Sequence, residues 1–339
     1  MVAARPGRRV AGRRGQSQRA RTSALALASL VAFACGGRVD GESGQGAAGA
    51  GTASAGETLI TLASGQENPS GLAVDSTGVY WTTGSHTVVT TQSVPTDGKV
   101  TRANLDGTDI MAVATGQAIP GPIGVANALV AWADLASIML FAPGGRAAAA
   151  ASAHDVYAVA TDGDNVYWTA PTGLSSVPVS GGGIAMLAGG TPASGSIGLD
   201  ADSVYWASSV GVMRVPKTNA NPVTLAATTS ATAVAVDATD VYWIDSSAAA
   251  IFRVPISGGT PTMVVSSPPN LAALAVDGIN VYWTSYSAGT VSKVPVDGGP
   301  VVTLASAQSF PTNIAVDSTS VYWTNANGYN GQIQKLTPK

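Results

Sequence analysis

Short apolar runs separated by turn residues recur along most of the chain. The clearest unit contains four such runs, at residues 271–277, 281–286, 290–296 and 300–306. The segments between them include Gly-Ile-Asn and Asp-Gly-Gly, whose residues accept the positive φ values of tight hairpins. Runs of six or seven residues bounded by such turns are typical of β-strands. The unit therefore predicts four antiparallel strands.

Every tryptophan in the chain marks one of these units. Six of the seven follow a Val-Tyr pair, and the exception follows Val130 and Ala131. Their spacings are 51, 36, 38, 37, 40 and 40 residues, close to the ~40–45 residues of a propeller blade. The pattern predicts an all-β, seven-bladed β-propeller with four-stranded antiparallel blades. The repeat with Ala131 is the weakest blade. The tryptophans are Trp81, Trp132, Trp168, Trp206, Trp243, Trp283 and Trp323.

The two ends of the repeat region predict how the ring closes. The chain finishes with GQIQKLTPK, which matches a third strand with no fourth strand after it. Residues 58–64 (TLITLAS) have the same character as the fourth strand at residues 300–306. The N-terminal strand is therefore predicted to close the last blade, which hides a sheet edge. The propeller domain is expected to span residues 57–339.

The N-terminus has the pattern of an export signal. Seven arginines precede residue 22, and an uncharged, largely apolar run covers residues 22–34. A positive region followed by a short apolar run is typical of a secretory signal peptide, here predicted at residues 1–34. Thirteen residues are too few for a membrane-spanning helix, which needs about 20.

The segment after the apolar run resembles the lipobox of bacterial lipoproteins. Ala34 precedes Cys35, the only cysteine in the chain, and Gly36 follows it. The resemblance implies that Cys35 carries lipid and that the protein belongs to the bacterial cell envelope, as an outer membrane lipoprotein or in a periplasmic or extracellular place. Residues 36–56 are almost wholly Gly, Ala and Ser, so residues 35–56 are predicted to be the lipidated Cys and a flexible linker.

The charge of the predicted mature chain is acidic. From Cys35 onward ten Lys and Arg stand against twenty Asp and Glu, a formal charge of −10. This balance argues against nucleic acid as a partner, because that binding depends on cationic side chains. It favours basic or neutral ligands. The expected partners are a protein, a peptide or a glycan, with membrane contact through the lipid anchor alone, and the protein is expected to be a monomer.

The Val-Tyr-Trp-Thr units resemble the YWTD repeats of low-density-lipoprotein-receptor-type propellers. They are more similar still to bacterial secreted propellers built on VYWTN and VPxxGG units. The resemblance covers residues 57–339 and implies a binding or scaffold protein, although the receptor propellers have six blades and this chain has seven repeats. The fourth motif position is often not Asp, so receptor-type ligands are not expected here.

Residues that carry chemistry are few. The first strand of six repeats ends in Asp, and the second repeat has Ala126 there. These carboxylates are interpreted as caps of the following turn rather than as a calcium ring. Two histidines and one cysteine leave no Cys/His zinc cluster, and hydrolase and nucleotide motifs are absent from the sequence. No cofactor or metal is expected. The six residues are Asp75, Asp162, Asp200, Asp237, Asp277 and Asp317.

Both histidines fall on the same predicted face of the ring. His86 lies in an insertion at residues 83–97, and His154 lies in an irregular connection that also holds Tyr157. Because function concentrates in loops on rigid scaffolds, His86, His154 and Tyr157 are the candidate ligand-binding residues. The alternative is a propeller enzyme similar to seven-bladed lyases, in which His86, His154 and Asp155 would be catalytic. We also hold open that the two histidines are unrelated surface residues.

Overall fold

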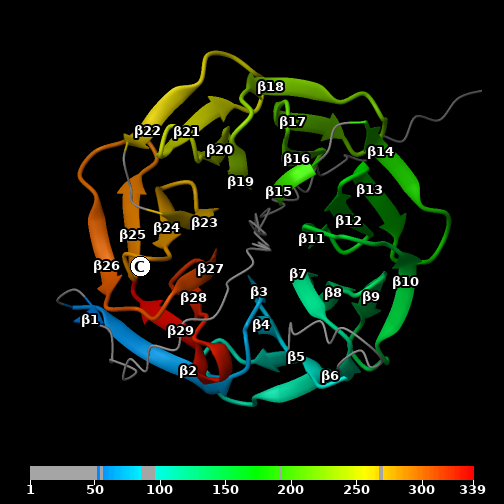
Figure 1. The fold of residues 1–339 in the computed structure, drawn as a ribbon, viewed down its shortest axis with the longest axis vertical. Coiled ribbons are helices and arrows are strands. Elements are labelled where there is room, and N and C mark those ends of the chain that lie inside the picture. The colour runs from blue at the N-terminus through cyan, green and yellow to red at the C-terminus, as the bar shows by residue number, and fades with distance from the viewer. Residues whose placement is uncertain (1–51, 54–55, 85–95, 191–192, 267–269) are drawn as a thin grey trace, which may run out of the picture.

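The computed structural model describes residues 52–53, 56–84, 96–190, 193–266 and 270–339. These residues form seven four-stranded antiparallel sheets arranged as a ring, with one short additional strand. Figure 1 shows the ring viewed along its axis, with the first strand of each blade nearest the centre. We call the strands of a blade a, b, c and d from the centre outward. The prediction of a seven-bladed propeller is confirmed.

The first three blades follow one another directly in the sequence. Blade 1 contains β3 (Gly71–Asp75), β4 (Gly78–Thr83), β5 (Gly98–Ala103) and β6 (Met111–Gln117). Blade 2 contains β7 (Pro120–Ala126), β8 (Leu129–Asp134), β9 (Ser137–Phe141) and β10 (Ala148–Ser152). Blade 3 contains β11 (Ala158–Thr161), β12 (Asn165–Ala170), β13 (Gly173–Pro178) and β14 (Ala185–Gly189). Blade 2 is therefore complete, although its pattern is the weakest.

The next three blades repeat the same order. Blade 4 contains β15 (Ala193–Leu199), β16 (Ser203–Ser208), β17 (Gly211–Pro216) and β18 (Val223–Ala227). Blade 5 contains β19 (Ala231–Val236), β20 (Asp240–Asp245), β21 (Ala250–Pro255) and β22 (Thr262–Ser266). Blade 6 contains β23 (Leu271–Val276), β24 (Asn280–Ser285), β25 (Thr290–Pro295) and β26 (Val302–Ser306).

Blade 7 joins the two ends of the domain. It contains β27 (Pro311–Val316), β28 (Val321–Asn325) and β29 (Gly331–Thr337), and its outer strand is β2 (Thr58–Gln66). A single-turn 3-10 helix, η1 (Gly328–Asn330), precedes β29. The predicted closure by the N-terminal strand is confirmed. In addition, β1 (Thr52–Ala53), inside the predicted linker, pairs with β26 at the outer edge of blade 6.

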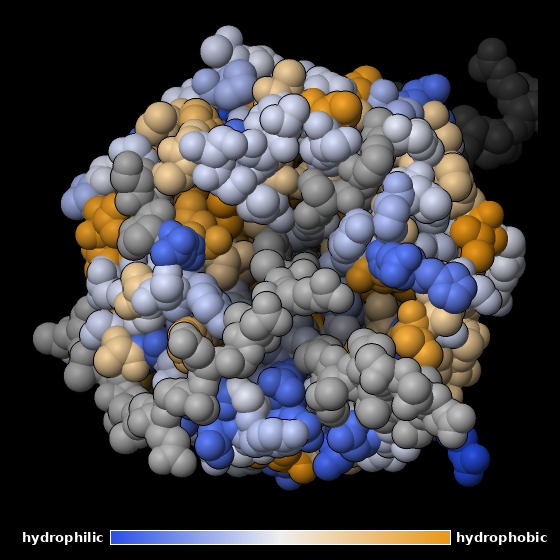
Figure 2. All heavy atoms as spheres, in the orientation of Figure 1, coloured by the Kyte–Doolittle hydropathy of each residue, from blue (hydrophilic) through white to orange (hydrophobic). Residues whose placement is uncertain are grey.

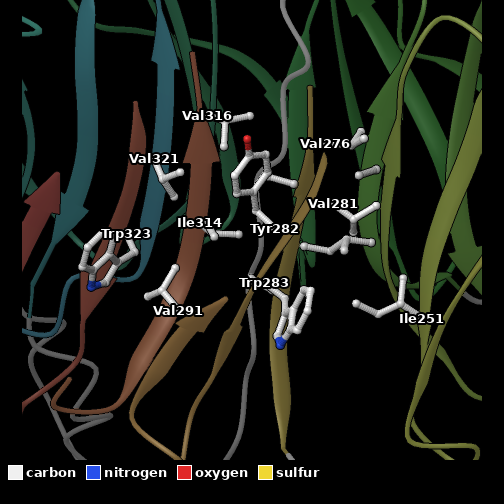
Figure 3. Close-up of a cluster of buried hydrophobic side chains, with 14 of the residues drawn as sticks. Ile251, Val276, Val281, Tyr282, Trp283, Val291, Ile314, Val316, Val321 and Trp323 are labelled. Atoms are coloured by element: carbon white, nitrogen blue, oxygen red, sulfur yellow. The ribbon is translucent and has the colours of Figure 1, made fainter. Parts of the chain in front are cut away.

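The aromatic residues of strand b form the core between blades. All seven tryptophans are at most 4% exposed, and the tyrosines that precede six of them are at most 2% exposed. Neighbouring side chains of a strand point to opposite faces, so Tyr and Trp pack toward different sides of the blade. Figure 3 shows Tyr282 and Trp283 of β24, with Tyr282 near Ile314 and Val316 of the next blade. Each blade is thus stabilised by both neighbours.

Antiparallel order divides the connections between two faces of the ring. The a–b and c–d turns lie at one end of the strands, which we call the turn face. The b–c connections and the d–a connections lie at the other end, which we call the loop face. In the described part of the chain, no helix is long and apolar enough to cross a membrane.

Candidate functional site

The carboxylates at the ends of strands a bind their own turns, as the sequence indicated. Asp317 is typical: one carboxylate oxygen accepts hydrogen bonds from the backbone N–H groups of Thr319 and Ser320, at 2.7 and 2.8 Å. The other oxygen accepts a hydrogen bond from the hydroxyl of Tyr322 at 2.8 Å. The same phenol bond occurs in blades 3 to 6 at 2.6 to 3.0 Å. These carboxylates therefore serve the fold.

The tyrosine partner of this Asp went unnoticed in the sequence, although a signal exists. In six repeats Tyr follows the Asp by five residues, as in Asp277 and Tyr282. Burial, followed by the nearby carboxylate, raises the pKa of these phenols in blades 3 to 7. Burial also acts to raise the pKa of Asp277, but hydrogen bonds from Lys339 and from the turn outweigh it and leave that pKa below its ordinary value.

Two lysines link the carboxylate of one blade to the following blade. Lys217 of blade 4 lies 2.9 Å from Asp162 of blade 3, and Lys339 of blade 7 lies 2.7 Å from Asp277 of blade 6. Each ammonium also lies 5.7 Å from the centre of a tyrosine ring in the earlier blade. Both carboxylates and both lysines are mostly buried. Within the described residues, no three His, Cys, Asp or Glu side chains gather as a metal site.

Three tryptophans have a glutamine partner that sequence reasoning also missed. The indole N–H groups of Trp81, Trp132 and Trp323 donate to glutamines fifteen positions earlier in the chain, at 2.8 to 3.0 Å. A Gln fifteen residues before a repeat Trp was the available signal. The buried indole N–H groups of Trp206 and Trp243 have no hydrogen-bond partner among the described residues. The glutamines are Gln66, Gln117 and Gln308.

The loop face carries a conformational exception. In four d–a connections, one residue has a φ between 40° and 54°. Each time, it lies four positions before the strand a residue that pairs with the repeat Trp of strand b. Three of these four are Asn or Asp, which tolerate the left-handed region. The fourth is Phe310, a bulky residue for which this conformation costs energy. The residues are Asn68, Asp155, Asn270 and Phe310.

Phe310 is also exposed. Its side chain is 46% accessible, and its ring centre lies 5.0 Å from that of Tyr286 in the b–c turn of the preceding blade. Tyr157 and Tyr329 on the same face are 37% and 73% exposed. Of the large hydrophobic side chains that are exposed in the described residues, the three aromatic ones all lie on the loop face. This face therefore presents a set of separate aromatic side chains.

The structure places three of the four sequence-predicted site residues in one connection. His154, Asp155 and Tyr157 all lie between β10 and β11 and are exposed. Backbone hydrogen bonds fix both ends of this segment, from Ala153 N to Ala136 O and from Tyr157 N to Thr169 O. His86 and most of its insertion, and also Cys35, lie outside the described residues.

The surface in Figure 2 shows how hydropathy is distributed on the side of the ring turned toward the viewer. Hydrophobic residues appear at several separate places around the ring, between hydrophilic ones. The strongest concentration of hydrophilic side chains lies at the bottom of this view, where Figure 1 places blade 1. This side therefore shows no single large apolar patch outside the grey atoms.

Comparisons with known proteins agree with the propeller fold. No family model and no curated protein sequence matches the chain. A streptogramin B lyase structure is similar with a TM-score of 0.64 and 14% identity, covering 84% of this chain and 98% of its own. The WD40 domain of Neurospora crassa Pan2 is similar with a TM-score of 0.61 and 10% identity, covering 83% and 96%. BamB from Moraxella catarrhalis is similar with a TM-score of 0.57 and 12% identity, covering 83% and 98%. At these identities the likeness describes the fold alone.

Proposed function

We propose that this chain is a binding protein of the bacterial cell envelope whose loop face binds a protein partner. The observation that carries the proposal is the set of exposed aromatic side chains on this face, Tyr157, Phe310 and Tyr329. Aromatic residues dominate the binding energy of many protein interfaces because they bury large areas with few rotatable bonds. A shared fold is compatible with many functions, so the proposal rests on this surface.

Phe310 adds a second argument for the same face. Three other blades place Asn or Asp at its position, and these residues adopt the left-handed conformation at lower cost. An exposed Phe at this position gains little from packing, apart from its contact with Tyr286. Residues that break a local rule without an evident gain in packing are expected at functional sites. We propose Tyr157, Phe310 and Tyr329 as the main ligand-binding residues, with His86 and His154 as minor contributors.

The proposed location follows from the N-terminal sequence. We place the mature chain at the outer membrane, attached by lipid on Cys35, with the acidic propeller extending from the linker. Its formal charge of −10 favours a basic or neutral partner surface.

Binding of envelope proteins to purified variants tests this function. Partners captured by the wild-type propeller are identified, and their affinities for Phe310→Asn and Tyr329→Ala are measured. Phe310→Asn restores the residue type of other blades, so the fold should persist while affinity falls at least about tenfold. Ile279→Ala, at a 70% exposed site on the turn face, is the matched control. Equal affinity of all three variants and the wild type contradicts the proposal.

The second candidate function is a lyase-like enzyme that uses the same face. It is favoured by the adjacent, exposed His154 and Asp155 in the β10–β11 connection. A general acid or base contributes at least about 10²-fold in rate, so His154→Ala and His86→Ala would reduce catalysis by that factor. In a binding protein the same substitutions reduce partner affinity only slightly, because the aromatic side chains remain.

A further inference from the structure

Blade 2 lacks the polar cluster that the other blades carry on the turn face. Every other blade has Asp at the end of strand a and a buried Tyr in strand b, whereas blade 2 has Ala126 and Ala131. The residue two positions before this Tyr site is Leu129 in blade 2 and is small or polar in the other blades, as in Asn165 and Ser203. The backbone N–H of Ala128 in the blade 2 turn donates instead to Asp75 of blade 1, at 2.9 Å.

The strand c residue opposite this tyrosine position also changes. In five other blades it is Arg or Lys, and in blade 2 it is Leu140, which pairs with Ala131. In three blades the cation crosses to the c–d turn of the next blade. Arg214 donates to Ile256 O at 3.2 Å, Arg253 lies 3.0 Å from Asp297, and Lys335 donates to Leu105 O at 2.7 Å. Leu140 is too short to reach the c–d turn of the next blade, and its apolar side chain has no N–H group to donate to that turn.

The groove between blades 2 and 3 is accordingly open. A pocket of about 340 Å³ lies between the two blades. Strands β9 and β10 line it on the blade 2 side, and the turn that follows β13 lines it on the blade 3 side. Small and apolar groups make up most of its wall: Leu129, Leu140, Ala148, Ala149, Ala150 and Pro178. Arg146, from the c–d turn of blade 2, also lines it. Arg146 is exposed and forms no ion pair with any described residue.

We propose that this pocket binds a small planar aromatic monocarboxylate. Its volume is within the ~300–1,000 Å³ of small-molecule sites, which are mainly apolar with few polar groups. The leucine, alanine and proline side chains of the wall offer apolar contacts to an aromatic ring. The guanidinium of Arg146 presents paired N–H donors whose spacing matches a carboxylate, and its charge complements that anion.

The site is independent of the function proposed above. Its lining residues come from strand ends and turns on the turn face, whereas Tyr157, Phe310 and Tyr329 lie on the loop face. A failure of one proposal therefore leaves the other standing.

Titration of the purified propeller with 2-naphthoate tests the inference by calorimetry and by NMR of the methyl groups. We expect a dissociation constant on the order of 1 mM, with shifts of the Leu129 and Leu140 methyl resonances. The uncharged analogue 2-naphthalenemethanol and the variant Arg146→Gln should each weaken binding about tenfold. Arg253→Gln, which removes an arginine of blade 5, is the matched control and should bind as the wild type does.

A second variant fills the groove instead of removing charge. Leu140→Arg restores the residue type of the other blades and should reduce 2-naphthoate binding at least about tenfold. Ala149→Gln, on the exposed edge strand β10, fills the same space if the first variant folds poorly, and a thermal melt verifies the fold of each. Wild-type affinity in Arg146→Gln and in the folded groove-filling variant, or methyl shifts confined to other blades, overturns the proposal.

Discussion

At the residue scale, the Asp at the end of strand a and the Tyr of strand b act together as one hydrogen-bonded unit in blades 3 to 7. Asp277 accepts two turn N–H groups and the Tyr282 phenol, and Lys339 then pairs with the same carboxylate. Hydrogen bonds to a charged group contribute about 1.5–3 kcal/mol each when they are well formed. The last residue of the sequence is thus tied to the blade before its own.

Lys339→Met should lower the stability of the propeller near neutral pH and make that stability depend less on pH. The pKa of Asp277 is below its ordinary value in the folded state, so its contribution to stability is present above about pH 4 and is lost as pH falls through the folded pKa. Without the ammonium, the pKa of Asp277 rises toward its unfolded value, so this carboxylate contributes less to stability above about pH 4. We expect a loss of roughly 1–3 kcal/mol in urea unfolding at about pH 6, and little difference at about pH 2.

Lys293→Met provides the control for this prediction. Lys293 pairs across the strands with Tyr282 but makes no ion pair with the described residues. Its removal should change stability little at either pH. A variant of Lys339 that loses as much stability at about pH 2 as at about pH 6 would show that the ammonium acts through packing alone.

The turn-capping role of these aspartates was predictable because it is local in sequence. Asp277 caps N–H groups two and three residues ahead, and such Asx turns depend only on neighbouring residues. The bond from Trp323 to Gln308 was not foreseen, because it joins a residue of β28 to one fifteen positions earlier, in the connection between β26 and β27. Phe310 was missed for another reason. Its left-handed φ is set by the geometry of the connection, and Phe usually avoids that conformation, so the residue type gave no sign of it.

At the element scale, the strand with the largest consequence is β2. It pairs with β29 from Thr58 to Gln66, and it buries Leu62 and Ala63 in a cluster with residues of blades 1 and 7. In the sheet order of blade 7, β2 is the described strand that lies beside β29 at the outer edge. The prediction from sequence succeeded here because residues 58–64 match the fourth strand of the repeat in type.

Deletion of residues 57–64 should open the ring. Blade 7 would keep three strands and expose the edge of β29, so we expect a marked drop in the melting temperature and a tendency to aggregate. Deletion of residues 36–51, outside the described part, is the matched truncation and should leave the melting temperature unchanged. Thermal melts that coincide for the two truncations would contradict the role assigned to β2.

Blade 2 illustrates what repeat patterns leave undetermined. The change from Tyr to Ala131 suggested a weak blade, and the four strands nevertheless form with regular pairing of β8 and β9. Backbone pairing depends on register, which the neighbouring runs preserve, and Ala131 itself is fully buried in the core. The pocket beside blade 3 is lined by Leu129 and Leu140 instead. A pocket between blades involves residues from two repeats, so the sequence pattern of one repeat did not reveal it.

At the scale of the whole molecule, the ring separates two kinds of surface. On the turn face, charged groups form hydrogen bonds and ion pairs within and between blades. The loop face carries the exposed aromatic residues. The sequence predicted this division of connections from the strand order alone. It did not predict which side chains would be exposed on the loop face, since exposure depends on how the d–a connections lie against neighbouring blades.

Attachment of the whole molecule is tested at Cys35. The lipobox resemblance predicts that Cys35→Ser transfers the protein from the membrane fraction to the soluble fraction of the envelope, while its melting temperature stays the same. Labelled fatty acid should enter the wild-type chain and not the variant. Absence of label from the wild-type chain contradicts lipidation.

The closure of blade 7 by β2 has a mechanical consequence for an anchored protein. A pulling force on the N-terminal side reaches β1 first, where only Thr52 and Ala53 pair with β26. It then reaches β2, the strand that seals the ring. The junction that carries the force is therefore the β2–β29 pair. Tension that separates it would open the propeller between its two ends, while blades 1 to 6 keep all four of their own strands.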